Sequence, residues 1–271
     1  MTFAEKYGPW VVVAGASDGV GAAFAGGLAE RGLNVVLLAR RQKVLEEVAA
    51  RITERTGAQT RTLAVDLAGG NATAVIAEAT ADLEIGSLVY CAGGDPNFRP
   101  FLANPVETAE AMVQRNCVMP MRLCHHFVPA MVKRGRGGVV IFSSGAALAG
   151  GPNMVTYGAT KAFDMLFAEG LWAELHDKGV DVLGLVLGKT DTPALRRVEY
   201  ARGLIESVNE RPPDAVAVDV VVSEAFENLA NGPTHIVGEL LRAGAQMLGS
   251  MPRNEAVRLV IQASAASMGA S

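Results

Sequence analysis

The sequence has few cysteines and no motif that would join them. Its three cysteines, Cys91, Cys117 and Cys124, are an odd number, and none are spaced as CxxC. A disulfide framework needs an even set, and a structural zinc site needs clustered cysteine or histidine ligands. We therefore expect three reduced thiols, no metal site and a cytoplasmic location.

Long apolar runs and an excess of positive charge are also absent. No stretch reaches the ~18 consecutive apolar residues that suggest a membrane-spanning helix, and Glu5 and Lys6 precede any apolar run, unlike in a secretory signal. The net charge of −4 gives no attraction for nucleic acid. Because half of the residues are apolar and 19% are charged, the chain can bury a sizeable core.

Short apolar runs alternate with helical patterns along the chain. The runs are apolar on both faces, which is typical of a parallel sheet buried between two helical layers. The sequence therefore predicts an α/β fold, a single doubly wound Rossmann-type domain over 1–271 with about seven parallel strands and helices on both faces. Strands are predicted at 10–14, 33–39, 62–65, 87–91, 138–142, 180–187 and 234–237, and helices at 19–31, 42–55, 105–133, 157–178 and 216–229.

Three regions depart from this pattern. The predicted helix at 105–133 contains Pro120 and Pro129, so a kink or a split is expected. The segment 193–213 is polar and has no strand pattern, which predicts an excursion that covers the substrate site. In the tail, 239–271, only 255–263 has a helical pattern, and the last residues are expected to fray.

A glycine-rich turn lies between the first predicted strand and the first helix. Its spacing is GxxxGxG rather than the usual GxGxxG of dinucleotide sites. Glycines let the backbone approach a pyrophosphate, and the following helix offers free N–H groups and the positive end of its dipole. A simple strand-to-helix turn is the alternative interpretation. The residues expected to contact the dinucleotide here are Gly15, Ser17, Asp18, Gly19, Val20 and Gly21.

No acidic residue follows the second strand, where an NAD site usually has one for the ribose diol. The strand is followed instead by Arg40 and Arg41. An arginine can bind the 2′-phosphate of NADP through charged, bidentate hydrogen bonds, whereas a carboxylate would repel it. We therefore favour NADP(H), with Arg40 as the main contact; the alternative is that both arginines are simply solvated.

Later strand ends offer further contacts to a dinucleotide. Asp66, followed by Leu67, would accept a hydrogen bond from the adenine amino group, or would instead cap a turn. Ala92 and Gly93 are small enough for the chain to pass close to the cofactor.

The strongest catalytic signal is Tyr157 with Lys161, four residues apart and so on one face of a helix. A nearby ammonium favours the ionised form of a phenol, which makes a tyrosine usable as an acid and base near neutral pH. Ser144 ends the fifth strand, at the sheet edge where ligands bind. YxxxK alone is common, and its combination with Ser144 and the glycine turn is what indicates catalysis.

Over residues 8–238 these motifs resemble the short-chain dehydrogenase/reductase family. Gly15, Gly19 and Gly21 match the family's glycine motif, Ser144, Tyr157 and Lys161 its catalytic set, and Asn116 its fourth-helix asparagine. The resemblance implies that Asn116 holds a water in a proton relay to Lys161, and that Lys161 hydrogen-bonds the nicotinamide ribose. It also implies a homodimer or homotetramer. By position, Gly188, Thr190 and Thr192 would lie at the nicotinamide, with the two threonines on its carboxamide.

The chain departs from the family pattern at three places. Tyr90-Cys91-Ala92-Gly93 stands where the family has Asn-Asn-Ala-Gly, which puts the side-chain bracing of the sheet there in doubt. Leu187-Gly188 replaces Pro-Gly, and Asp18 replaces a basic residue found in some NADP-dependent members. None of these changes removes a catalytic group.

The sequence thus predicts an NADP(H)-dependent oxidoreductase that interconverts a ketone and a secondary alcohol. The alternative is a non-catalytic NADP(H)-binding sensor on the same fold; a dehydratase or epimerase is disfavoured by the short C-terminal tail. The substrate is expected to be lipophilic (steroid-like, fatty or aromatic), unless the apolar loop residues only pack the lid. Those residues are Phe98, Phe101, Leu148, Met154 and Leu195, with Asn97 and Arg99 at the rim.

Overall fold

The computed structural model describes residues 1–94 and 98–268. Within these residues, seven parallel strands form a sheet in the order β3-β2-β1-β4-β5-β6-β7, which confirms the predicted fold class. The order reverses between β1 and β4, and sheets of this kind bind ligands beside such a point. The strands are β1 (Trp10–Ala14), β2 (Asn34–Ala39), β3 (Thr60–Ala64), β4 (Ile85–Tyr90), β5 (Gly137–Ser144), β6 (Val180–Leu187) and β7 (Thr234–Ile236).

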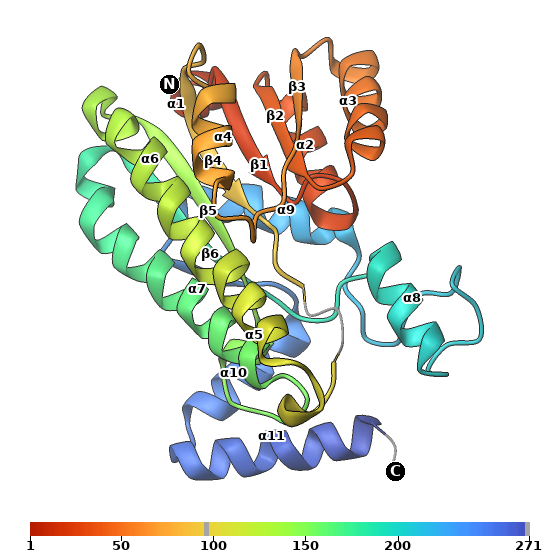
Figure 1. The fold of residues 1–271 in the computed structure, drawn as a ribbon. Helices are drawn as coiled ribbons and strands as arrows, with labels where there is room; N and C mark the ends of the chain where they lie inside the picture. The colour runs from red at the N-terminus through yellow and green to blue at the C-terminus, as the bar shows by residue number, and fades with distance from the viewer. Residues whose placement is uncertain (95–97, 269–271) are drawn as a thin grey trace.

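Helices cover both faces of the sheet (Figure 1). One face packs against α2 (Gly19–Glu30), α3 (Gln42–Thr56) and α9 (Val218–Asn228). The other packs against α4 (Ala72–Ala79), α6 (Met119–Arg134) and α7 (Val155–Leu175).

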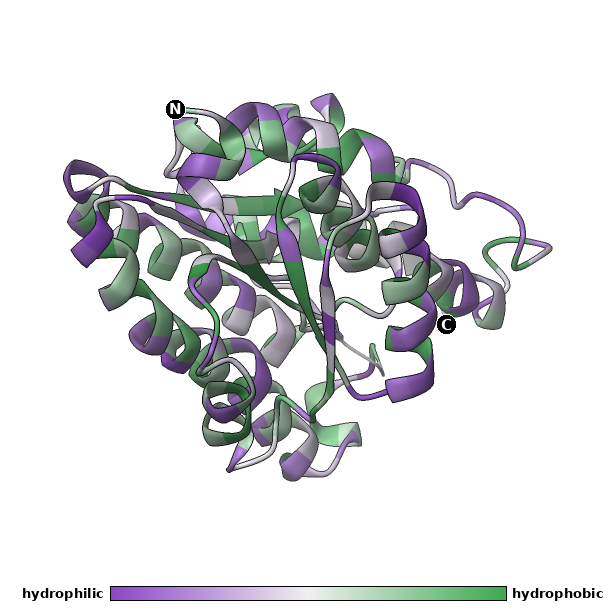
Figure 2. Ribbon diagram, turned by 90° about the horizontal axis from the view of Figure 1, so that it is seen from above, coloured by the Kyte–Doolittle hydropathy of each residue, from purple (hydrophilic) through white to green (hydrophobic). Residues whose placement is uncertain are grey.

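Each face of the sheet has its own apolar core. In β1, Val11 and Val13 belong to one core, whereas Val12 and Ala14 belong to the other. Successive side chains of a strand point to opposite faces, so a strand covered on both sides must be apolar throughout. Figure 2 shows this as hydrophobic colouring along the central strands between the helices.

The predicted long helix at 105–133 is split by a π-helical turn. The chain runs through α5 (Val106–Val113), the π turn η2 (Gln114–Val118) and α6. Pro120 lies in the first turn of α6, directly after the π turn, and Pro129 lies within the helix. The expected interruption is therefore present, and the turn that causes it carries Asn116.

Several elements had no clear signal in the sequence, but the helical pattern at 255–263 is confirmed, because it lies within α11 (Arg253–Met268). The excursion at 193–213 contains α8 (Pro193–Ala201), which starts at the cap residue Thr192 and lies beside the sheet rather than on it (Figure 1). No helix of the described residues has the length and apolarity needed to cross a membrane. The remaining elements are α1 (Phe3–Tyr7), α10 (Glu239–Gly249), α11 (Arg253–Met268) and the short turns η1 (Phe101–Ala103), η3 (Gly145–Ala147), η4 (His176–Lys178) and η5 (Leu229–Asn231).

Burial in these cores predicts where truncation destabilises the protein. Leu28 on α2 is 2% exposed, whereas Leu240 on α10 is 71% exposed. Leu28→Ala should lower the free energy of unfolding by about 2–5 kcal/mol, because it removes buried apolar surface and leaves a cavity. Leu240→Ala should change it by no more than about 0.5 kcal/mol. Urea unfolding of the two variants measures both values, and equal losses would contradict the assigned core.

Candidate active site

A cleft of about 630 Å³ lies at the C-terminal edge of the sheet. Loops after β1, β4, β5 and β6 line it, together with the start of α7 and helix α8, which we call the lid helix. The structure thus brings the glycine turn and the serine, tyrosine and lysine to one cavity. The residues expected from the sequence that line it are Gly15, Asp18, Gly19, Val20, Gly21, Gly93, Ser144, Tyr157, Lys161, Gly188, Thr190 and Thr192.

The glycine turn packs so closely that it admits no side chain at Gly21. A Cβ placed on Gly21 would lie 2.2 Å from the carbonyl oxygen of Gly15. Asp18 caps α2, because its Oδ1 accepts a hydrogen bond from the Gly19 N–H at 2.8 Å. Asp18 also forms an ion pair at 3.4 Å with Arg197 of α8, so this carboxylate connects the turn with the lid helix.

Arg41, rather than Arg40, contacts the glycine turn. The Arg41 Nη2 donates to Ser17 Oγ at 3.3 Å, and both arginines are exposed. One charged donor, Arg41, therefore stands beside the turn. The sequence pointed to Arg40 as the main contact and named Arg41 and Ser17 as well; the hydrogen bond between these two was not predicted.

The ends of β3 and β4 carry the other residues expected at the dinucleotide. Asp66 Oδ1 accepts from the Ala68 N–H at 3.0 Å, which is the turn-capping role, and Leu67 is buried in the core. After β4, the Cys91 N–H donates to the Ala14 oxygen at 2.9 Å. This pairing keeps Ala92 close to the end of β1.

The catalytic candidates are held by contacts between β5 and α7. Ser144 ends β5, and its Oγ accepts from the Ala146 N–H at 3.2 Å. Tyr157 lies in the first turn of α7, and the Lys161 Nζ is 5.9 Å from the centre of its ring. Ser143 Oγ donates to the Lys161 carbonyl at 2.7 Å. One strand therefore places the serine and anchors the helix that carries the other two groups.

Lys161 has a buried partner that the sequence prediction missed. Its Nζ donates to the Phe142 carbonyl at 2.8 Å and to Asp164 Oδ2 at 2.9 Å. The side chains of Lys161 and Asp164 are only 5% and 1% exposed. Burial is the largest single influence and lowers the pKa of the Lys161 ammonium, but the charge and hydrogen bond of Asp164, together with Tyr157 and Cys91, raise that pKa above its ordinary value. The available signal was the i, i+3 spacing on a buried helix face.

Asn116 lies next to this pair, on the π turn. Its Nδ2 donates to Thr160 Oγ1 at 2.9 Å and, more weakly, to the Gly93 carbonyl at 3.4 Å. Gly93 has a φ of 129°, and a Cβ there would lie 2.6 Å from Asn116 Oδ1. That oxygen is buried and accepts no hydrogen bond from the described residues.

Tyr90 braces the sheet where the family has an asparagine. Its side chain is buried, and its hydroxyl donates to the Arg115 carbonyl in the π turn. The phenol therefore connects the end of β4 to the turn that carries Asn116, which answers the doubt raised by the altered motif.

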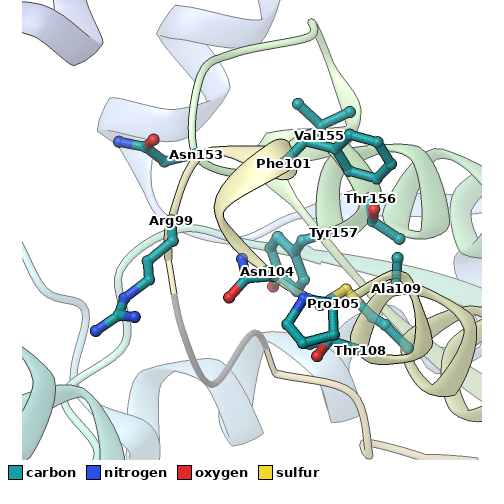
Figure 3. A pocket seen from close by; sticks show the side chains of 11 residues that line it. Arg99, Phe101, Asn104, Pro105, Thr108, Ala109, Asn153, Val155, Thr156 and Tyr157 are labelled. Carbon is teal, nitrogen blue, oxygen red and sulfur yellow. The ribbon is translucent and has the colours of Figure 1, made fainter.

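The mouth of the cleft is apolar with a few charges. Phe98, Met154 and Leu195 line the cleft, and Arg99 and Phe101 line a smaller pocket that also contacts Tyr157. In Figure 3, Phe101 lies near Val155 over this pocket, and Arg99 points away from Tyr157.

Two of the expected mouth residues are placed differently or not described. Leu148 is not among the residues that line either pocket, and its carbonyl accepts from Arg253 of α11. Asn97 lies outside the described residues. The sequence prediction missed charged groups of the lid: Lys189 pairs with the buried Glu199 at 3.3 Å, and Arg202 stacks on Phe98.

The brace at Tyr90 gives a stability prediction. Tyr90→Phe should lower the free energy of unfolding by about 1–2 kcal/mol, because the Arg115 carbonyl loses its donor. Tyr200 is 51% exposed on α8, so Tyr200→Phe should stay within about 0.5 kcal/mol of the wild type. Urea unfolding measures both, and an unchanged stability in Tyr90→Phe would show that the phenol is no brace.

Known proteins resemble the chain over nearly its full length. A family model described as short chain dehydrogenase matches residues 9–202. The 7beta-hydroxysteroid dehydrogenase of Clostridium sardiniense is 33% identical over 267 residues, which cover 95% of this chain and 96% of the relative. That of Collinsella aerofaciens is 33% identical over 239 residues, 88% of this chain and 89% of the relative.

Solved structures agree. One from work on 7beta-hydroxysteroid dehydrogenase stereoselectivity has a TM-score of 0.86 and 29% identity, covering 96% of this chain and 99% of its own. A short-chain dehydrogenase from Sphingobium yanoikuyae in complex with NADPH has a TM-score of 0.75 and 28% identity, and the match covers 90% of this chain and 96% of that one. Together with the Ser-Tyr-Lys cleft, these matches show that the chain belongs to the short-chain dehydrogenase/reductase family and is an oxidoreductase acting on CH–OH and C=O groups.

Proposed function

We propose that the protein is an NADP(H)-dependent oxidoreductase that interconverts a ketone and a secondary alcohol on a lipophilic, steroid-like substrate, with Tyr157 as the acid and base. The observation that carries this proposal is the shared cleft, in which the glycine turn and the serine, tyrosine and lysine face the same space. A dinucleotide on the turn and a carbonyl compound at Tyr157 would therefore meet there.

The residues around the turn fit a dinucleotide. The cradle at Gly21 has no room for a Cβ, and the N-terminus of α2 directs free N–H groups to the cleft. Arg40 and Arg41, the latter with Ser17, would hold the 2′-phosphate. Gly188, Thr190 and Thr192 would lie at the nicotinamide end. NADP(H) bound in this way supplies or accepts the hydride.

Two hydroxyl groups act on the substrate oxygen. During reduction, negative charge grows on that oxygen, and the Ser144 and Tyr157 hydroxyls donate hydrogen bonds to it. They stabilise the transition state more than the ground state, because the charge is larger there. Tyr157 then delivers its proton to the oxygen. In the oxidative direction the Tyr157 phenolate takes the proton back.

Lys161 and Asn116 support the tyrosine. The Lys161 ammonium stabilises the phenolate that forms when Tyr157 gives up its proton. Of its three N–H groups, two are used by Phe142 and Asp164, which leaves one for the cleft. A water that relays protons to Lys161 would donate a hydrogen bond to Asn116 Oδ1, which accepts none from the described residues.

The lining of the outer part of the cleft supports an apolar substrate. Apolar side chains form much of its outer lining, including Phe98, Leu195 and Val198. The relatives named 7beta-hydroxysteroid dehydrogenase point to the same substrate class. A panel of hydroxysteroids and their ketones, with small aliphatic ketones for comparison, tests this choice.

The proton-transfer role of Tyr157 is tested by removing its hydroxyl. Tyr157→Phe should keep the fold and NADPH binding but lose at least ~10²-fold in turnover, because general acid–base catalysis is lost. Steady-state kinetics with the most active substrate of the panel gives the comparison. Tyr200→Phe is the matched control and should retain turnover. Near-normal turnover of Tyr157→Phe would refute the assignment.

The preference for NADP(H) is tested at the two arginines. Arg40→Ala and Arg41→Ala should each raise the KM for NADPH by at least about 10-fold, because a charged hydrogen bond is worth about 1.5–3 kcal/mol. The KM for NADH should not rise, since NADH has no 2′-phosphate. Arg51→Ala, an exposed change on α3, is the control. Equal effects on both cofactors would contradict a 2′-phosphate site.

A further inference from the structure

The buried partner of Lys161 has no assigned role in the proposed chemistry. Asp164 is 0% exposed and lies one helical turn after Lys161 on α7. Burying a carboxylate costs free energy unless a partner of opposite charge is present. Asp164 therefore bears on the charge and the position of its partner, Lys161.

Only one of the two carboxylate oxygens of Asp164 has a hydrogen-bond partner among the described residues. Asp164 Oδ2 accepts from Lys161 Nζ at 2.9 Å, and the other carboxylate oxygen, Oδ1, is buried and accepts no hydrogen bond from the described residues. Most of the stabilisation of this carboxylate therefore comes from Lys161. In return, the carboxylate and the Phe142 carbonyl hold the lysine ammonium by two of its three N–H groups.

We propose that Asp164 is a positioning residue for the oxidoreductase reaction, which through a buried ion pair keeps the Lys161 side chain charged and fixed next to Tyr157. This inference rests on the proposed role of Lys161 in holding the Tyr157 phenolate. Without a counter-charge, a buried ammonium loses its proton more easily, and an uncharged lysine cannot stabilise a phenolate.

The groups that surround Asp164 remain neutral over the working pH range. Tyr90 on β4, Cys117 on the π turn and Cys124 on α6 all interact with its charge. Burial raises the pKa of Cys117 to about 11 and that of Cys124 to about 12, and it raises the pKa of Tyr90 well above its ordinary value. On the Lys161 side, burial raises the pKa of Cys91 to about 12.

Asp164 is the group in this cluster that changes charge in mildly acidic solution. Burial raises the pKa of its carboxyl to about 6, although the charge of Lys161 opposes the increase. Below that pH the wild-type protein has a neutral side chain at 164, as Asp164→Asn has at every pH. The wild type and Asp164→Asn should therefore behave alike in acid and differ in alkali.

The test is the pH profile of kcat for alcohol oxidation in the wild type, Asp164→Asn and Asp164→Glu. At about pH 6, Asp164→Asn should lie within about 3-fold of the wild type. At alkaline pH the activity of Asp164→Asn should fall, and this fall should begin at least about one pH unit below that of the wild type. The reason is that burial lowers the pKa of Lys161, and the variant has no carboxylate charge to oppose that effect. Asp164→Glu should restore the limb, since it restores the charge.

A matched control removes a carboxylate from the same region without touching the pair. Asp177 follows α7 and its side chain is 89% exposed, so Asp177→Asn should reproduce the wild-type profile. If Asp164→Asn loses activity by the same factor at every pH, or if its alkaline limb coincides with that of the wild type, Asp164 has only a structural role and the inference is wrong.

A second measurement depends neither on turnover nor on the folding of the Asp164 variants. In wild-type protein labelled with ¹³C at the lysine ε-carbon, the Lys161 signal, identified by its absence in Lys161→Met, should keep its charged form to at least about pH 10. Loss of the proton below about pH 9 would overturn the inference.

The two measurements separate this inference from the proposed function. A wild-type protein that turns over no member of the panel would refute the proposed function, while the lysine titration would still report on the pair. The inference alone would be refuted if the enzyme is active, Lys161 titrates as expected, and Asp164→Asn leaves the alkaline limb of the pH profile unchanged.

Discussion

The site depends on one buried ammonium at the C-terminal edge of the sheet. Lys161 is 4% exposed, yet it carries a charge that must reach Tyr157 and a dinucleotide. A charge at such a position is tolerated only when fixed acceptors replace water. The Phe142 carbonyl at the end of β5 and the Asp164 carboxylate provide these acceptors. The packing of α7 on β5 and β6 is thus also the electrostatic support of the active site.

Elements far apart in the chain meet around this charge. The π turn after α5 brings Asn116 to Thr160, one residue before the lysine, and Tyr90 at the end of β4 braces that turn. Gly93 passes Asn116 at a distance that admits no side chain. At the end of β4, where this chain departs from Asn-Asn-Ala-Gly, the Tyr90 hydroxyl therefore connects the strand to the π turn.

Local patterns were sufficient to predict the sheet and to single out the serine, tyrosine and lysine that share the cleft. Strands buried on both faces, a glycine turn after the first, and Tyr157 four residues before Lys161 are all visible in a few consecutive residues. Asp164, the hydrogen bond between Arg41 and Ser17, and the lid charges were missed, because their partners are set by tertiary packing. An aspartate three residues after a lysine has the same spacing on an exposed helix, and only burial distinguishes the two cases. Helices α8 and α10 were missed although both are amphipathic, and few or none of their residues are buried.

The central claim is that the phenol, the ammonium and the serine hydroxyl surround the reacting end of a dinucleotide. A crystal structure of the protein with NADP⁺ tests this most directly. The account predicts the pyrophosphate on the glycine turn, the ribose of the nicotinamide within hydrogen-bond distance of Lys161 Nζ, and Ser144 and Tyr157 facing one side of the nicotinamide ring. A dinucleotide bound with its nicotinamide away from these three side chains would contradict it.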